Sequence, residues 1–144
     1  MPKSGYVFLP HTTDAYVEAV GETLEEALQF AGMALTDTMC AIDSISPKLT
    51  EHIEASGPDE VALLYDWLES ILLRFDLDRK VYSRFKVAPI AKSPTGLRAS
   101  AEVSGETYDR QKHGSKVEVK AVTYHKMEVI QENSYAIARF VLDL

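Results

Sequence analysis

The sequence lacks the features that mark membrane, secreted and disulfide-stabilised proteins. Its 144 residues include one cysteine, Cys40, which cannot form an internal disulfide. No apolar stretch approaches the ~20 residues of a membrane-spanning helix. The first residues, Met-Pro-Lys-Ser-Gly, have no hydrophobic segment of the kind found in secretory signals. We therefore expect a protein of a reducing, cytoplasmic setting that has no membrane partner.

The common signatures of catalysis and metal binding are missing as well. The chain has no glycine-rich phosphate loop and no Gly-x-Ser-x-Gly motif. No histidine and cysteine spacing resembles a zinc site. His11 and His125 each lie at the end of an expected strand, where a histidine more often makes a structural hydrogen bond than it binds a ligand. These absences leave no enzyme class favoured by motif alone.

Basic charge is scarce outside one segment. The chain carries 15 basic and 22 acidic residues, a net charge of −7. Residues 110–126 have a local charge of +4, so the remainder carries −11. Independent binding to nucleic acid needs several cations that neutralise phosphates. The balance therefore favours a protein partner or a small ligand, and we expect no strong direct binding to nucleic acid.

Hydrophobic periodicity predicts a single α+β domain over residues 1–144, with two long helices packed on a mostly antiparallel or mixed β-sheet. The first helix opens at Thr23, which forms a capping-box pattern with Glu26 and precedes an apolar face that continues to Ile42. The second begins near Asp59 and ends at residues 76–79. Strands are expected at residues 6–9, 15–20, 49–57, 81–90, 97–105, 116–131 and 135–143.

The chain ends in a strand pattern, Phe-Val-Leu-Asp-Leu, that predicts a docked C-terminus. Docking would fix two carboxylates, the Asp143 side chain and the α-carboxylate of Leu144, which repel each other unless a cation lies between them. Asp14 is a candidate third ligand. Oxygen ligands suit Ca²⁺ or Mg²⁺, although the sequence leaves open whether the two aspartates meet. Another acidic pair, Asp76 and Asp78, is interpreted as a charged helix end.

The expected strand at 116–131 carries many functional groups. Strand alternation predicts that Val117, Val119, Ala121 and Thr123 point inward. The opposite face would then carry Lys116, Glu118, Lys120, Val122 and Tyr124. This face is interpreted either as an ordinary solvated strand face or as a basic patch that meets an acidic or phosphate-bearing partner.

Four stretches of the chain together resemble the archease family. His11-Thr12-Thr13-Asp14 is similar to the family's His-Thr-Ala-Asp opening, with Thr13 in place of alanine. The run from Leu64 to Glu69, followed by Asp76, resembles the second-helix motif, although residues 71–75 depart from it. The most distinctive block runs from Gly105-Glu106 through His113 to Lys-x-Glu-x-Lys-Ala-x-Thr-Tyr-His at 116–125, and the ending Val-Leu-Asp-Leu matches the usual terminus.

The resemblance implies a function that composition does not reveal. Archeases are protein cofactors of the RtcB-type RNA ligase, which joins tRNA halves after intron removal. They promote guanylylation of the ligase, sustain multiple turnover and broaden its nucleotide use, without being catalytic themselves. The family's divalent metal, reported as calcium, would be held by Asp14, Asp143 and Leu144. Contacts to the ligase are expected from Lys116, Glu118, Lys120, Tyr124 and His125.

Two other functions remain open from the sequence. The first is a metal-dependent hydrolase that uses Asp14, Asp143, His11 and His125, since metal-assisted hydrolysis needs a positioned base and open coordination positions. The second is a general chaperone for nucleic acid or protein, for which strongly salt-dependent RNA binding would be diagnostic.

Overall fold

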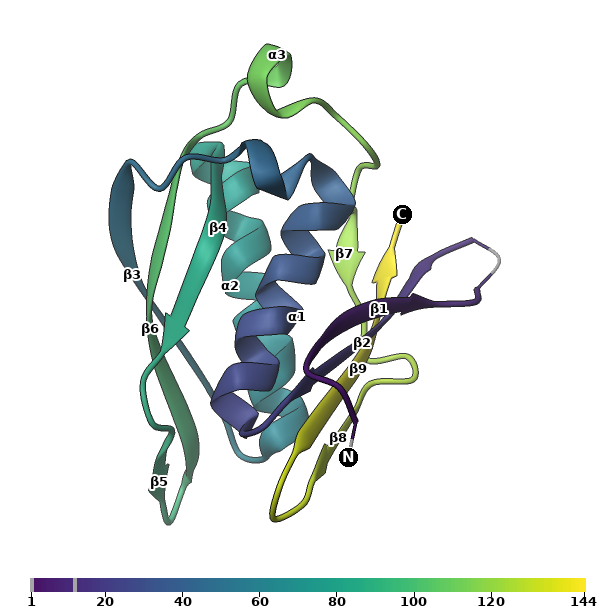
Figure 1. The fold of residues 1–144 in the computed structure, drawn as a ribbon. Helices are drawn as coiled ribbons and strands as arrows, with labels where there is room; N and C mark the ends of the chain where they lie inside the picture. The colour runs from purple at the N-terminus through teal and green to yellow at the C-terminus, as the bar shows by residue number, and fades with distance from the viewer. Residues whose placement is uncertain (1, 12) are drawn as a thin grey trace.

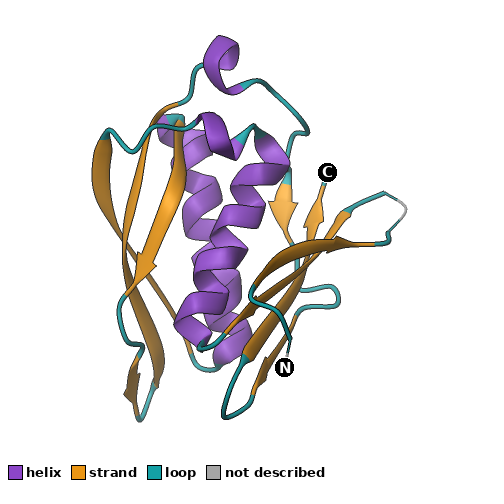
Figure 2. Cartoon of the chain, in the orientation of Figure 1, coloured by secondary structure: helices purple, strands orange, loops and turns teal. Residues whose placement is uncertain are grey.

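Two long helices lie side by side between two β-sheets (Figure 1). The computed structural model describes residues 2–11 and 13–144. The first helix, α1, spans Leu24–Met39, and the second, α2, spans Glu60–Asp78. A 3₁₀ turn, Ile42–Ser44, follows α1, and a short helix, α3, spans Arg110–His113. Figure 2 shows the helices enclosed by strands on both sides, which confirms the predicted α+β class. Instead of one sheet there are two.

The first sheet contains both ends of the chain. It has the strand order β1-β2-β9-β7, with β8 also paired to β9, and every pairing is antiparallel. Its strands are β1 (Gly5–Leu9), β2 (Ala15–Gly21), β7 (Ala121–Val122), β8 (Glu128–Gln131) and β9 (Ala136–Asp143).

The second sheet covers the other side of the helices and is also antiparallel. It has the order β3-β6-β4, and β5 extends it as a hairpin with β6. Its strands are β3 (Leu49–Gly57), β4 (Lys80–Val87), β5 (Ala91–Ser93) and β6 (Gly96–Thr107). The strand expected at 81–90 therefore ends at Val87.

Both helices start where predicted, and each start is capped by a side chain. The Thr23 hydroxyl accepts a hydrogen bond from the Glu26 amide at 3.1 Å, and the Asp59 carboxylate accepts one from the Ala62 amide at 2.8 Å. The end of α1 differs from expectation, because the helix stops at Met39 and Ile42 belongs to the following 3₁₀ turn. No helix in the described part of the chain is long and apolar enough to span a membrane.

The core fills the layer between the sheets. Trp67 of α2 is fully buried and donates its indole N–H to the Leu28 carbonyl of α1 at 2.8 Å, which satisfies its polar atom and joins the two helices. The surrounding apolar side chains come from both helices and from the inner faces of both sheets, among them Leu35, Leu68, Phe85, Val103, Phe140 and Leu142.

We expect Leu68→Ala to lower the free energy of unfolding by about 2–5 kcal/mol, because Leu68 is completely buried in this core. Leu77 lies on the same helix but is 76% exposed, so Leu77→Ala should change stability by less than about 0.5 kcal/mol. Urea denaturation of both variants measures the difference. Equal losses would contradict the assigned orientation of α2.

Candidate functional site

The chain end is docked as predicted. Strand β9 pairs with β2 on one side and with β7 and β8 on the other. Phe140, Val141 and Leu142 are buried, and the half-buried Leu144 packs against the core. The main chain is held up to its last residues, because the Lys120 amide donates to the Asp143 carbonyl at 2.7 Å. The terminal carboxylate is therefore attached to a fixed strand.

The register of β2 and β9 brings the two distant aspartates together. Ala15 pairs with Leu142 at the end of the ladder. Asp14 and Asp143 each adjoin this last pair, so the register brings the two residues to the same end of the β2–β9 ladder. Asp143 is exposed, whereas the Asp14 side chain is 26% exposed.

His11 adds a polar group beside Asp14. Its Nδ1 lies 3.9 Å from a carboxylate oxygen of Asp14 and is buried, with no hydrogen-bond partner among residues 2–11 and 13–144. Its ring also packs edge-on against Tyr16. The intervening Thr12 of the predicted motif lies outside the described residues.

The donor set fits a hard cation. Within residues 2–11 and 13–144, no three histidine, cysteine, aspartate or glutamate side chains gather as a metal site. A site at Asp14 and Asp143 therefore depends on the α-carboxylate of Leu144 for a third anionic donor. In that same part of the chain, neither aspartate forms an ion pair with lysine or arginine. Carboxylate oxygens of this kind would suit Ca²⁺ or Mg²⁺ better than Zn²⁺.

The prediction of one continuous strand at 116–131 is wrong. Residues 114–120 are extended but unpaired in a sheet, and only β7 and β8 belong to one. Val122 pairs with Leu142 and Glu128 with Arg139, so residues 123–127 lie opposite only two residues of β9. This large bulge interrupts the pairing with β9 between β7 and β8. The predicted alternation already fails before the bulge: Val122, expected outside, is 5% exposed, and Val117, expected inside, is 44% exposed. Residues 114–120 follow hydrogen bonds to α1 and β9 instead of a strand ladder.

Lys116 binds the C-terminal part of α1, a structural role that the sequence analysis did not predict. Its ammonium group binds Asp37 twice, at 2.9 Å to the carboxylate and 3.0 Å to the carbonyl oxygen. The amides of Lys116 and Val117 donate to the carbonyls of Met39 and Thr38. The last turn of α1 has no basic residue of its own. Lys116 therefore supplies the positive charge and the donors that a helix C-terminus requires.

The other residues expected to contact a partner, Glu118, Lys120, Tyr124 and His125, are all exposed. Lys120 is exposed, and its neighbour Ala121 pairs with Asp143, so Lys120 lies beside the chain end. Glu118 is exposed, and Tyr124 and His125 project from the bulge. The structure does not gather His125 with His11 and the aspartates into a group of three or more within its described residues.

A buried ionic cluster lies in the family-like block that precedes Lys116. Glu106 is 6% exposed, and its carboxylate accepts hydrogen bonds from Lys112 at 2.7 Å, the Ser46 amide at 2.8 Å and His113 at 2.8 Å. Nδ1 of the fully buried His113 accepts from the Asp109 amide. The proton is therefore assigned to Nε2, and His113 is a neutral donor to Glu106. Sequence reasoning gave Glu106 and His113 no role, although both belong to the distinctive block.

The cluster fixes the turn that leaves the second sheet. Gly105 precedes Glu106 at a position where a Cβ atom would lie 1.9 Å from the Val81 carbonyl oxygen, so only glycine fits there. The Ala41 amide donates to the His113 carbonyl, which attaches this turn to the end of α1. Figure 1 shows the same segment continuing over the helix ends to β7.

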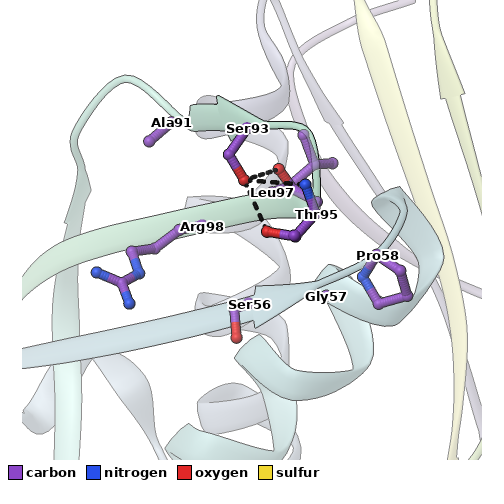
Figure 3. A pocket seen from close by; sticks show the side chains of 9 residues that line it. Ser56, Gly57, Pro58, Ala91, Ser93, Thr95, Leu97 and Arg98 are labelled. Carbon is purple, nitrogen blue, oxygen red and sulfur yellow. Dashed lines mark hydrogen bonds between the residues drawn. The ribbon is translucent and has the colours of Figure 1, made fainter.

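A further hollow, of about 520 Å³, lies between the β5–β6 hairpin and the end of β3. Figure 3 shows the residues that line it. Ser93 and Thr95 bond to each other at 3.0 Å, and Arg98 pairs with Glu54 at 3.6 Å. These polar groups already have partners, so the cavity offers little specific recognition, and the candidate site remains the chain end.

The fold and site together define a two-sheet α+β protein whose docked C-terminus lies beside an N-terminal aspartate. Residues 6–144 match the model of the Archease protein family (MTH1598/TM1083), and the chain belongs to this family. It is 39% identical to the protein archease of Methanopyrus kandleri over 94% of this chain and 96% of the relative. It is 37% identical to that of Sulfolobus acidocaldarius, over 96% and 98%.

Solved structures agree with this placement. The solution structure of Methanobacterium thermoautotrophicum protein 1598 has a TM-score of 0.82 and 33% identity, covering 97% of this chain and 99% of that one. The crystal structure of an archease from Thermotoga maritima has a TM-score of 0.59 and 17% identity, over 100% and 98%, and supports the fold alone.

The buried cluster predicts a pH dependence of stability. Hydrogen bonds from Lys112, the Ser46 amide and His113 hold the pKa of Glu106 well below its ordinary value of 4.5. A carboxyl whose pKa falls on folding adds stability above its unfolded pKa and loses it as pH drops through the folded pKa. Glu106→Gln should therefore destabilise the protein at pH 7, and the gap to wild type should narrow as pH falls below about 4.5.

Glu102→Gln is the matched control, because Glu102 is exposed on the same strand. Denaturant melts of the three proteins between pH 3 and 7 measure the effect. A constant gap between Glu106→Gln and wild type across this range would contradict the assigned ionisation.

Proposed function

We propose that the protein is a non-catalytic activator of an RtcB-type RNA ligase in tRNA splicing, which promotes guanylylation and multiple turnover and broadens nucleotide use. Family membership over residues 6–144 supports the assignment. The observation that carries it furthest is the β2–β9 register, which gives the activator a rigid, negatively charged tip at Asp14, Asp143 and the chain end.

In this proposal Asp14, Asp143 and the α-carboxylate of Leu144 hold a divalent cation, with Ca²⁺ as the first choice. Three anionic groups this close repel one another. A bound cation would supply the compensating charge and fix the terminus against the N-terminal loop. The chain's own contribution is the strand pairing that presents the donors before any ion arrives, which lowers the ordering cost of binding.

Contact with the ligase would be made around this tip. Lys120 is exposed beside the chain end, and Glu118, Tyr124 and His125 lie on the adjoining segment. Lys116 is 48% exposed but already bonded to Asp37, so we assign it mainly to holding the segment in place.

The deciding experiment is ligase guanylylation and RNA joining at several ratios of ligase to this protein. Activation at substoichiometric amounts, together with inactivity of the protein alone, supports the proposal. The Thermotoga maritima relative is described as a possible chaperone. Equal protection of unrelated proteins from aggregation, without ligase activation, would favour that general role.

The metal proposal predicts that Asp143→Asn weakens Ca²⁺ binding at least about tenfold, because an anionic oxygen donor is lost. An extension of three glycines after Leu144 should do the same, because it removes the terminal carboxylate without changing a side chain. Isothermal calorimetry measures both, with the same extension at the N-terminus as the control. Wild-type affinity in the C-terminally extended protein would remove Leu144 from the ligand set.

The contact proposal predicts that Lys120→Glu slows association with the ligase severalfold, because charge complementarity mainly accelerates encounter. The defect should shrink as added salt screens the charges. Lys86→Glu is the matched control, since Lys86 is exposed on β4 of the other sheet. Stopped-flow measurements at two ionic strengths give the rates, and identical rates for the two variants would place the interface elsewhere.

A further inference from the structure

Two tyrosines form an exposed stack beside the candidate site. The rings of Tyr65, on α2, and Tyr124, in the bulge, have centroids 4.2 Å apart and planes only 5° from parallel. Tyr124 remains 57% exposed. One face of its ring covers Tyr65, so the other face is open to a further planar group.

The bulge holds Tyr124 in a fixed position. On one side of it, the Thr123 hydroxyl donates to the Val141 carbonyl of β9 at 3.1 Å. On the other, the Met127 amide donates to the Tyr124 carbonyl at 3.1 Å, in a turn that Lys126 closes with a left-handed φ of 56°. Hydrogen bonds thus hold the backbone on both sides of Tyr124, so binding of a ligand to its ring would cost little conformational entropy.

The segment that carries Tyr65 is acidic. Residues 59–73 contain four acidic residues and no lysine or arginine. In the portion of the chain that the structure describes, none of these four forms an ion pair. The Glu69 carboxylate beside the Tyr65 hydroxyl raises the pKa of Tyr65. The lysine of the bulge, Lys126, places its ammonium group 5.3 Å from the centre of the Tyr16 ring instead.

We propose that Tyr65 and Tyr124 form a receptor for an arginine side chain of a partner protein. A guanidinium is planar and cationic, so it can stack on the open face of Tyr124 while the Glu69 carboxylate beside Tyr65 attracts its charge. Lysine has no plane to stack. The base of a nucleotide could stack equally well, but its phosphate would be repelled by Glu69. This inference depends on the proposed function in one respect only: the proposed function names the RNA ligase as the partner protein that carries the arginine.

The first test uses the isolated protein and needs no ligase. Arginine amide is titrated in while the ring-proton NMR signals of the tyrosines are followed, with lysine amide and AMP at equal ionic strength. Arginine amide should give saturable shifts of Tyr124, and lysine amide and AMP much smaller ones. Glu69→Gln should weaken the arginine response, and Tyr124→Ala should abolish the accompanying shifts of Tyr65. Stronger shifts with AMP, or Tyr65 shifts that survive Tyr124→Ala, would overturn the proposal.

The second test measures ligase binding. Tyr124→Ala should weaken it about tenfold, whereas Tyr124→Phe, which keeps the ring face, should stay near wild type. Phe8→Ala is the control, because Phe8 is a 48% exposed aromatic on β1. Calcium affinity should be unchanged in all three. Wild-type ligase affinity in Tyr124→Ala would overturn the receptor, whereas failure of wild type to bind the ligase would overturn the proposed function and leave the arginine titration to decide this inference.

Discussion

The antiparallel pairing of β9 on both of its edges is the constraint on which the rest of the structure depends. The strand joins β2 to β7 and β8, and its inner residues Phe140 and Leu142 fill the core between sheet and helices. Arg139 reinforces the pairing across three strands, with ion pairs to Glu18 on β2 and Glu128 on β8. Because β9 is also the last strand, the same pairing that stabilises the sheet fixes the chain end beside Asp14.

The segment between β6 and β7 connects this pairing to the remainder of the fold. Glu106 and His113 fix its beginning under the second sheet, and Lys116 fixes its middle on the C-terminus of α1. The contact between Glu106 and His113 satisfies buried groups that would otherwise be unpaired, whereas the contact of Lys116 with Asp37 joins partly exposed side chains. The segment therefore reaches β7 in a defined position, with Lys120 beside the chain end and Tyr124 turned onto α2. Structural and proposed binding residues alternate along one short stretch of chain.

Acidic and basic side chains are distributed unevenly over the chain end, α2 and residues 110–126. The tip concentrates carboxylates that lack lysine or arginine partners among the described residues, which is the condition for recruiting a hard cation. Glu69 of α2 lies beside the aromatic stack of Tyr65 and Tyr124, which favours a cationic group there. Two lysines of residues 110–126 already form ion pairs within the protein, Lys112 with Glu106 and Lys116 with Asp37. A basic run in a sequence therefore overstates the basic surface that a partner meets.

Local patterns in the sequence determined the helices, their starts at Thr23 and Asp59 and the strand character of the terminus, because these depend on neighbours within a few residues. Charge at the chain end and motif resemblance both pointed to Asp14 and Asp143, but only the β2–β9 register brought them to the same end of one ladder. The division into two sheets, the bulge at 123–127 and the attachment of Lys116 to α1 were decided by tertiary structure. Alternation along 116–123 misassigned Val117 and Val122, because long-range hydrogen bonds to α1 and β9 override a local period of two.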